Sequence, residues 1–217
     1  MTTFAILLAM ALLGAAPAAG AEGASLVTAV AAGDLPTAKR LIAAGADLEA
    51  RNGSGETALL AAVRGNRVEI ARALIDAGAD INARAGNRDT PFLLAGASGR
   101  TEIIAAMIPA GPDLTLFNRF GGTALIPACE RAHVETIALL LTTAIDVDHV
   151  NALGWTCLLE IVILGDGGPR HVEITRLVLA AGARPDIADK EGVSPLAHAR
   201  AKGQREVAAL IVGAGGR

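Results

Sequence analysis

The sequence predicts an all-α solenoid, a row of helix-turn-helix units joined by extended loops, on three observations. An apolar block that opens with threonine returns at a constant interval of about 33 residues, at Thr57, Thr90, Thr123 and Thr156, and such a period is typical of repeat proteins. Each block is followed by a second apolar segment with helical spacing, and most of these segments lead to Gly-Ala-Asp or a close variant of it. Hydrophobic residues make up 52% of the chain but aromatic residues only 2%, which favours helices that pack closely through alanine.

The chain begins with an uncharged apolar run over residues 1–13, which has the length of the hydrophobic region of a secretory signal peptide and is short for a membrane span. Small residues follow, and Ala19-Gly20-Ala21 fits the pattern of a cleavage site. We therefore predict a signal peptide over residues 1–21, cut after Ala21. The Ala- and Gly-rich composition indicates a bacterial protein, so the expected destination is the periplasm. Because the segment has no Lys or Arg, an uncleaved leader that anchors the chain in the inner membrane stays an alternative.

The mature chain, residues 22–217, is predicted to form one domain of six repeats and to contain no membrane span. The apolar blocks place the repeats at about residues 24–56, 57–89, 90–122, 123–155, 156–193 and 194–217. In most repeats a Gly or Asn turn separates the two helices, and Gly45, Gly78, Gly111 and Gly182 are expected to cap the second helix in the left-handed conformation. Two short helices cannot bury their own apolar face, so stability must come from stacking neighbouring repeats.

The fifth repeat is longer than the others, because the interval from Thr156 to Ser194 exceeds the regular interval from Thr123 to Thr156. The extra residues fall in the segment 165–170, between the two helices of that repeat. Insertions in repeat proteins go to loops. The segment is therefore either a tolerated loop or a lip beside a binding groove.

The recurring order of helix, turn, helix, Gly-Ala-Asp and extended finger is similar to the ankyrin family. The resemblance covers roughly residues 24–215. It departs from the family's Thr-Pro-Leu-His block, where the histidine is replaced by Leu60, Leu93, Ile126, Leu159 and Ala197. The resemblance implies a non-catalytic module, expected as a monomer, that binds another protein through the tips of its fingers and the concave side of its first helices.

Charge and motifs argue against several other classes of function. The net charge is −3 and Lys and Arg are scattered among acidic residues, so no nucleic-acid partner is expected. The glycine-rich segments lack the Lys-Ser/Thr ending of a phosphate-binding loop, and no cofactor is predicted. The recurrent glutamates suit the first turn of a helix, and the four histidines lack metal-ligand spacing, so neither a catalytic nor a metal site is predicted. An enzyme with a carboxylate or thiol on the concave face, and a self-assembling spacer, remain alternatives.

The two cysteines, Cys129 and Cys157, stand at positions that the repeat explains. The first occupies a place where small buried residues are usual, and the second replaces the proline that opens a helix. We therefore expect two buried free thiols. A disulfide between neighbouring repeats, which an oxidising compartment permits, is the alternative.

The positions that the repeat leaves variable indicate where a partner binds. They are polar or small in the second and third repeats but become apolar and aromatic from the fourth onward. Exposed apolar patches usually mark interaction sites, and aromatic residues and Arg are enriched there. The predicted partner-binding residues are Phe117, Arg119, Phe120, Arg131, Val150, Leu153, Trp155, Ile163 and Leu164. Alternatively, Phe117, Phe120 and Trp155 pack against one another to stiffen neighbouring fingers. An adaptor, an inhibitor or immunity-type protein, and a role in envelope stress all fit such a surface.

Overall fold

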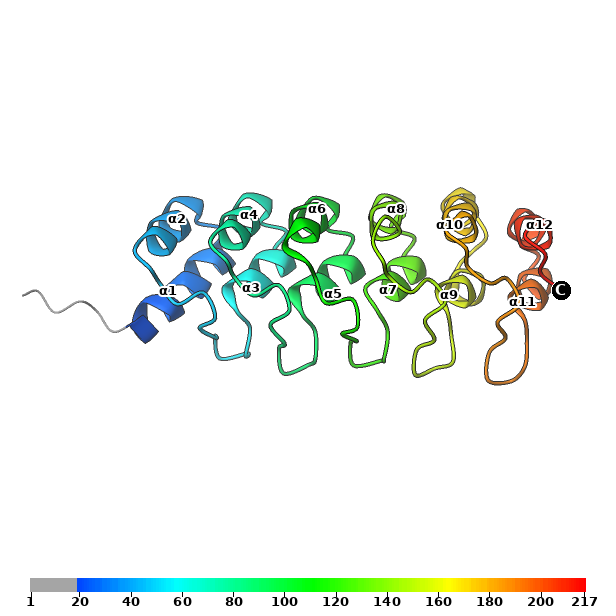
Figure 1. Ribbon diagram of the computed structural model, residues 1–217, viewed down its shortest axis with the longest axis horizontal. Coiled ribbons are helices and arrows are strands. Elements are labelled where there is room, and N and C mark those ends of the chain that lie inside the picture. The colour runs from blue at the N-terminus through cyan, green and yellow to red at the C-terminus, as the bar shows by residue number, and fades with distance from the viewer. Residues whose placement is uncertain (1–18) are drawn as a thin grey trace, which may run out of the picture.

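The structure is a computed structural model that describes residues 19–217, with side chains described from residue 26 onward. Its helices stand in two parallel rows, and extended fingers project from the side of the first row (Figure 1). The first row consists of α1 (Ala19–Ala32), α3 (Ala58–Arg64), α5 (Pro91–Ala97), α7 (Leu125–Glu130), α9 (Cys157–Leu164) and α11 (Pro195–Ala201). The second row consists of α2 (Leu35–Ala43), α4 (Val68–Asp76), α6 (Thr101–Met107), α8 (Val134–Leu140), α10 (Pro169–Ala180) and α12 (Arg205–Gly213), with a short 3-10 turn, η1 (Ile108–Ala110), after α6. The predicted all-α solenoid is confirmed.

Of the predicted signal peptide, residues 1–21, the first 18 lie outside the described residues and the last three begin α1. The proposed cut after Ala21 therefore falls within the first turn of α1. None of the helices between residues 19 and 217 is both long enough and apolar enough to cross a membrane.

The recurrent threonine is the N-cap of the first helix in several repeats. The Thr57 hydroxyl accepts a hydrogen bond from the Leu60 backbone N–H at 3.3 Å. Thr90, Thr156 and Ser194 make the equivalent bond with the residue three positions later. Such a cap satisfies one of the backbone N–H groups that the first turn of a helix leaves without a partner. The threonine period seen in the sequence is thus a period of helix starts.

We expect Thr57→Ala to lower the free energy of unfolding by about 1 kcal/mol, because it removes this capping bond. Thr123 is the matched control, since it is equally buried but its Oγ1 has no hydrogen-bond partner in the described part of the chain. Thr123→Ala should therefore cost less than Thr57→Ala. Urea denaturation of both variants measures the difference, and equal losses would contradict a capping role for the Thr57 hydroxyl.

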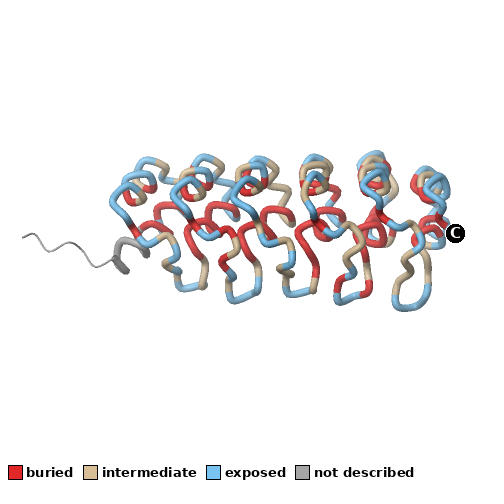
Figure 2. Tube along the Cα trace, viewed as in Figure 1, coloured by how far each residue is buried: buried red, intermediate tan, exposed pale blue. Residues whose placement is uncertain are grey.

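The core runs the length of the molecule between the two rows of helices (Figure 2). Its first-row contribution includes Leu59, Phe92, Leu125, Leu158 and Leu196, one from each of the second to sixth repeats, each no more than 3% exposed. Gly96 marks how closely the first-row helices approach, because a Cβ atom there would lie 2.6 Å from the Ala124 carbonyl oxygen. The small residues that the composition pointed to are therefore needed where neighbouring repeats touch.

The second helical segments of the first, second, third and fifth repeats end as expected near left-handed glycines, whereas α8 has no such glycine directly after it. Gly45, Gly78, Gly111 and Gly182 have φ angles of 80°, 89°, 73° and 94°. A side chain is disfavoured in this conformation, so Gly is the residue that ends such a helix at least cost. Each of these glycines directs the chain out of the second row and into the finger that precedes the next repeat.

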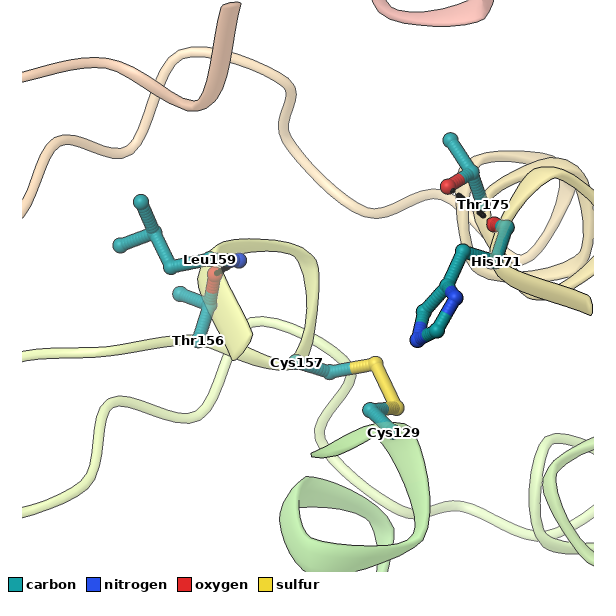
Figure 3. The surroundings of a disulfide bond; sticks show 6 residues. All are labelled: Cys129, Thr156, Cys157, Leu159, His171 and Thr175. Carbon is teal, nitrogen blue, oxygen red and sulfur yellow. Dashed lines mark hydrogen bonds between the residues drawn. A yellow bond between two sulfur atoms is a disulfide. The ribbon is translucent and has the colours of Figure 1, made fainter. Parts of the chain in front are cut away.

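Cys129 and Cys157 form a disulfide bond, and the expectation of two free thiols is wrong (Figure 3). The bond joins the last turn of α7 to the first residue of α9, with 5.6 Å between the two Cα atoms. The two cysteines are 28 residues apart, which is less than one repeat, so they do not occupy the same place in successive repeats. The place of each cysteine in its own repeat predicts burial. It does not predict the disulfide, because only the stacking of repeats brings the end of α7 beside the start of α9.

Candidate functional site

A pocket of about 360 Å³ lies where the fourth and fifth repeats meet. Two fingers and two first-row helices contribute to it: the finger before α7, the finger before α9, and α7 and α9 themselves. Its lining consists of Asn118, Arg119, Phe120, Gly122, Ile126, Pro127, Glu130, Arg131, Asn151, Leu153, Trp155, Glu160 and Leu164. The volume lies toward the lower end of the range of pockets that hold small ligands.

Apolar side chains that reach solvent gather at this pocket. Phe120, Leu153 and Leu164 are each about half exposed, and Trp155 is half-buried beside them. Among the described residues, Val150 and Val212 are the other large hydrophobic side chains exposed to a similar extent. A single exposed apolar side chain is ordinary on a protein surface, whereas several around one hollow are characteristic of a binding surface.

The finger before α9 is held in place by Asn151, which is buried. Its Oδ1 accepts hydrogen bonds from the backbone N–H groups of Leu153, at 2.9 Å, and Trp155, at 3.0 Å. The Ala152 N–H donates to the Phe120 carbonyl at 2.9 Å, which ties this finger to the one before α7. These hydrogen bonds hold the backbone of the fingers that carry Phe120, Leu153 and Trp155, so less backbone freedom is left to lose on binding.

Glu160 is the unusual residue of the pocket, because its carboxyl is buried and only 4% of the residue is exposed. Its Oε1 accepts a hydrogen bond from the Asn151 side-chain amide at 2.9 Å. Burial raises the pKa of Glu160 to about 7, with a further contribution from the nearby Glu130 carboxylate, while the bond from Asn151 acts in the opposite direction. The carboxyl is thus poised to change charge near neutral pH.

The equivalent place in the other repeats shows how Glu160 differs. The matching residues of the second, third and fourth repeats are Ala61, Leu94 and Pro127, none of which carries a charge. In the sixth repeat the matching residue is His198, whose Nε2 lies 2.7 Å from a carboxylate oxygen of Asp189 at the base of the preceding finger. The sixth repeat therefore pairs an acid with a base at this place, whereas the fifth pairs an acid with a neutral amide.

The two arginines that line the pocket are already engaged by the repeat before them. The Arg119 guanidinium lies over the Phe120 ring, 4.5 Å from its centroid, and 3.8 Å from the Asp89 carboxylate. Arg131 donates a hydrogen bond to the Ala97 carbonyl at 2.6 Å. Neither arginine forms an ion pair or hydrogen bond with Glu160.

Six of the nine predicted partner-binding residues line the pocket: Arg119, Phe120, Arg131, Leu153, Trp155 and Leu164. The other three do not. Phe117 stacks on His149, with 4.4 Å between ring centroids, Val150 is exposed beside that pair in sequence, and Ile163 packs against the core. Within residues 26–217, Phe117 therefore stacks on His149. It does not stack on Phe120 or Trp155, as the alternative of stiffened fingers would require.

The sequence interpretation missed Glu160 and Asn151 as pocket residues. Aligning the repeats would have drawn attention to Glu160, since this position holds Ala, Leu or Pro in the second, third and fourth repeats. The inserted segment 165–170 is not part of the pocket lining. Instead, the Lys202 ammonium and the Gln204 amide donate hydrogen bonds to the Gly165 carbonyl, at 2.8 and 2.9 Å, so the last repeat holds this loop.

Fold and site together define a helical repeat protein with a pocket between neighbouring repeats, and comparison with known proteins agrees on the fold. A family model described as ankyrin repeats in three copies matches residues 26–118. An ankyrin repeat domain from Acinetobacter baumannii, solved as a crystal structure, is 46% identical, with a TM-score of 0.86 over 89% of this chain and 98% of that one. The chain belongs to the ankyrin-repeat family.

Other relatives support this assignment. The crystal structure of a second ankyrin repeat protein is 38% identical, with a TM-score of 0.85 over 88% of this chain and 97% of that one. The ankyrin repeat domain of Bcl-3, a member of the IkappaB protein family, is 28% identical, with a TM-score of 0.78 over 88% of this chain and 86% of that one. The ankyrin repeat protein YahD of Escherichia coli is 45% identical over 58 residues, which is 27% of this chain and 29% of that relative. Ankyrin repeats are in general protein-interaction modules, and the fold is generally non-enzymatic.

Proposed function

We propose that this protein is a non-catalytic module that binds a partner protein through the pocket between its fourth and fifth repeats. The observation that carries the proposal is the gathering of Phe120, Leu153 and Leu164, each about half exposed, around a pocket that also includes Trp155. Burying these side chains against a partner removes apolar surface from water, and aromatic anchors in a pocket commonly dominate the energy of an interface.

We expect the double variant Phe120→Ala/Trp155→Ala to lose partner binding by about 100-fold or more, because truncating a central aromatic anchor typically costs at least about 2 kcal/mol and two are removed. The test is affinity capture from a periplasmic extract with the wild-type chain, followed by titration of the captured protein against both forms. Val212→Ala is the matched control, since it removes an apolar side chain that is 49% exposed on α12, outside the pocket. Unchanged capture by the double variant, with helical circular dichroism intact, would contradict the proposed site.

We further propose that the protein acts in the periplasm. The predicted signal peptide supports this location, and so does the disulfide, because disulfides form and persist in oxidising compartments such as the periplasm. We expect the chain recovered from a periplasmic fraction to begin at Glu22, as amino-terminal sequencing would show. An intact leader in the membrane fraction would instead favour the anchored alternative.

A further inference from the structure

The fifth repeat buries an acidic group without supplying a basic one. Removing a carboxylate from water is costly unless a cation or several hydrogen-bond donors replace the lost solvation. Glu160 receives one side-chain hydrogen bond, from the neutral amide of Asn151. The two equivalent positions one repeat later hold Asp189, in the finger before α11, and His198, whose side chains lie 2.7 Å apart. His198 thus has an ionisable partner within the fold, whereas Glu160, which lines the pocket, has only a neutral amide.

The charges around Glu160 favour a cation as the missing partner. Glu130 also lines the pocket, is exposed, and has no hydrogen bond or ion pair within the described part of the chain. Arg119 and Arg131 are the basic residues of the lining: Arg119 lies 3.8 Å from the Asp89 carboxylate and Arg131 donates a hydrogen bond to the Ala97 carbonyl, so neither is paired with Glu160 or Glu130. An anion entering the pocket would meet two carboxyls, and an apolar group would desolvate Glu160 further without replacing its solvation.

The walls fit a long side chain with a charged end. Trp155, Leu153 and Leu164 offer apolar surface along the pocket, and the carboxyls of Glu160 and Glu130 offer acceptors in the same space. Lysine and arginine side chains combine an aliphatic stem with a cationic head, and they bury the stem along apolar surface when the head is satisfied. A cation beside a tryptophan ring gains a further electrostatic attraction.

We propose that the pocket receives a lysine or arginine side chain of the partner protein, with the Glu160 carboxylate as its principal counter-ion and Glu130 as a second. This inference rests on the proposed function and specifies which chemistry of the partner the site recognises. The cation would supply to Glu160 a further polar partner at hydrogen-bond distance, as Asp189 does for His198 at the equivalent place.

The experiment uses a displayed library of random peptides selected against the purified protein, followed by fluorescence polarisation with labelled copies of the enriched peptides. We expect these peptides to share one Lys or Arg. Replacing that residue by norleucine should weaken binding about 10-fold or more, and Glu160→Gln should weaken binding of the parent peptide by a similar factor. The norleucine peptide should bind wild type and Glu160→Gln about equally, since the two changes remove the same interaction.

Glu206→Gln is the control for net charge, because it removes one exposed acidic group on α12 away from the pocket. It should leave binding of the parent peptide unchanged. If no peptide with a basic residue is enriched, or if Glu160→Gln binds the parent peptide as tightly as wild type, the cationic anchor is wrong. If the peptides bind the Phe120→Ala/Trp155→Ala variant as tightly as wild type, both the proposed site and the cationic anchor are wrong. If they lose affinity for that variant but not for Glu160→Gln, only the cationic anchor is wrong.

Discussion

Reducing the Cys129–Cys157 disulfide should lower the free energy of unfolding by about 3 kcal/mol. The bond closes a loop over a sequence separation of 28 residues, and in the chain-entropy account a loop of this length restricts the unfolded ensemble by about 3–4 kcal/mol. Native strain and residual structure in the unfolded chain commonly reduce the gain, so we expect the lower end of that range. Urea denaturation of the oxidised and reduced protein at one pH measures the difference.

The control for this measurement is the Cys129→Ala/Cys157→Ala variant, which cannot form the bond. Its stability should be the same with and without reductant. A difference would reveal an effect of the reductant on the rest of the chain. Counting thiols on denatured, unreduced protein gives an independent check, and we expect none. Two free thiols, or identical urea midpoints for oxidised and reduced protein, would show that the bond does not form in solution. Because the bond joins α7 to α9, its loss acts on the two repeats that line the pocket.

Glu160→Gln should stabilise the protein by about 1–2 kcal/mol at pH 8 and leave its stability nearly unchanged at pH 4. The pKa of Glu160 is about 7 in the folded chain against a usual 4.5, so between these values the folded state binds more protons than the unfolded state. Stability therefore falls as the pH rises from 4.5 to 7, and the full penalty is present above 7. A pKa difference of one corresponds to about 1.4 kcal/mol, and solvent in the open pocket screens part of the shift.

Urea denaturation at a series of pH values tests this expectation. Glutamine keeps an acceptor for the Asn151 amide but cannot ionise, so the variant should lack the decline in stability that wild type shows between pH 4.5 and 7. Glu130→Gln is the matched control, because it removes the neighbouring charge and should reduce that decline without abolishing it. Parallel pH profiles for wild type and Glu160→Gln would contradict the burial of an ionisable carboxyl. A residue that destabilises the fold while serving a site is a common compromise in proteins.

The same variant separates structural from functional roles. Replacing a purely structural glutamate would change stability and binding in the same direction, because a less stable fold presents a less stable surface. We expect Glu160→Gln to raise stability above pH 7 and yet lower affinity for a basic peptide. Opposite signs in the two measurements identify a group that is retained for binding.

Much of the fold could be predicted because its signals are local and repeated. A threonine that caps a helix acts on a backbone N–H three residues later, and a left-handed glycine acts on the turn in which it lies. Thr57, Thr90 and Thr156 each cap the first helix of a repeat, so the repeat period can be recognised without knowing how the repeats stack. The clustering of apolar residues on the later fingers, with Phe120 and Trp155 among them, is likewise a property of the sequence alone.

The chemistry of the pocket could not be predicted in the same way, because it depends on how one repeat lies against the next. Stacking places Cys129 beside Cys157, buries Glu160 against the Asn151 amide, and engages Arg131 with a carbonyl of the preceding repeat. The sequence by itself determined a row of helix pairs and the fingers on which apolar residues gather, since these follow from interactions within a few residues. Only the tertiary structure decided that the two cysteines join, which carboxyl is buried and which charged side chains are already paired, since these follow from contacts between helices and fingers that are not neighbours in the sequence.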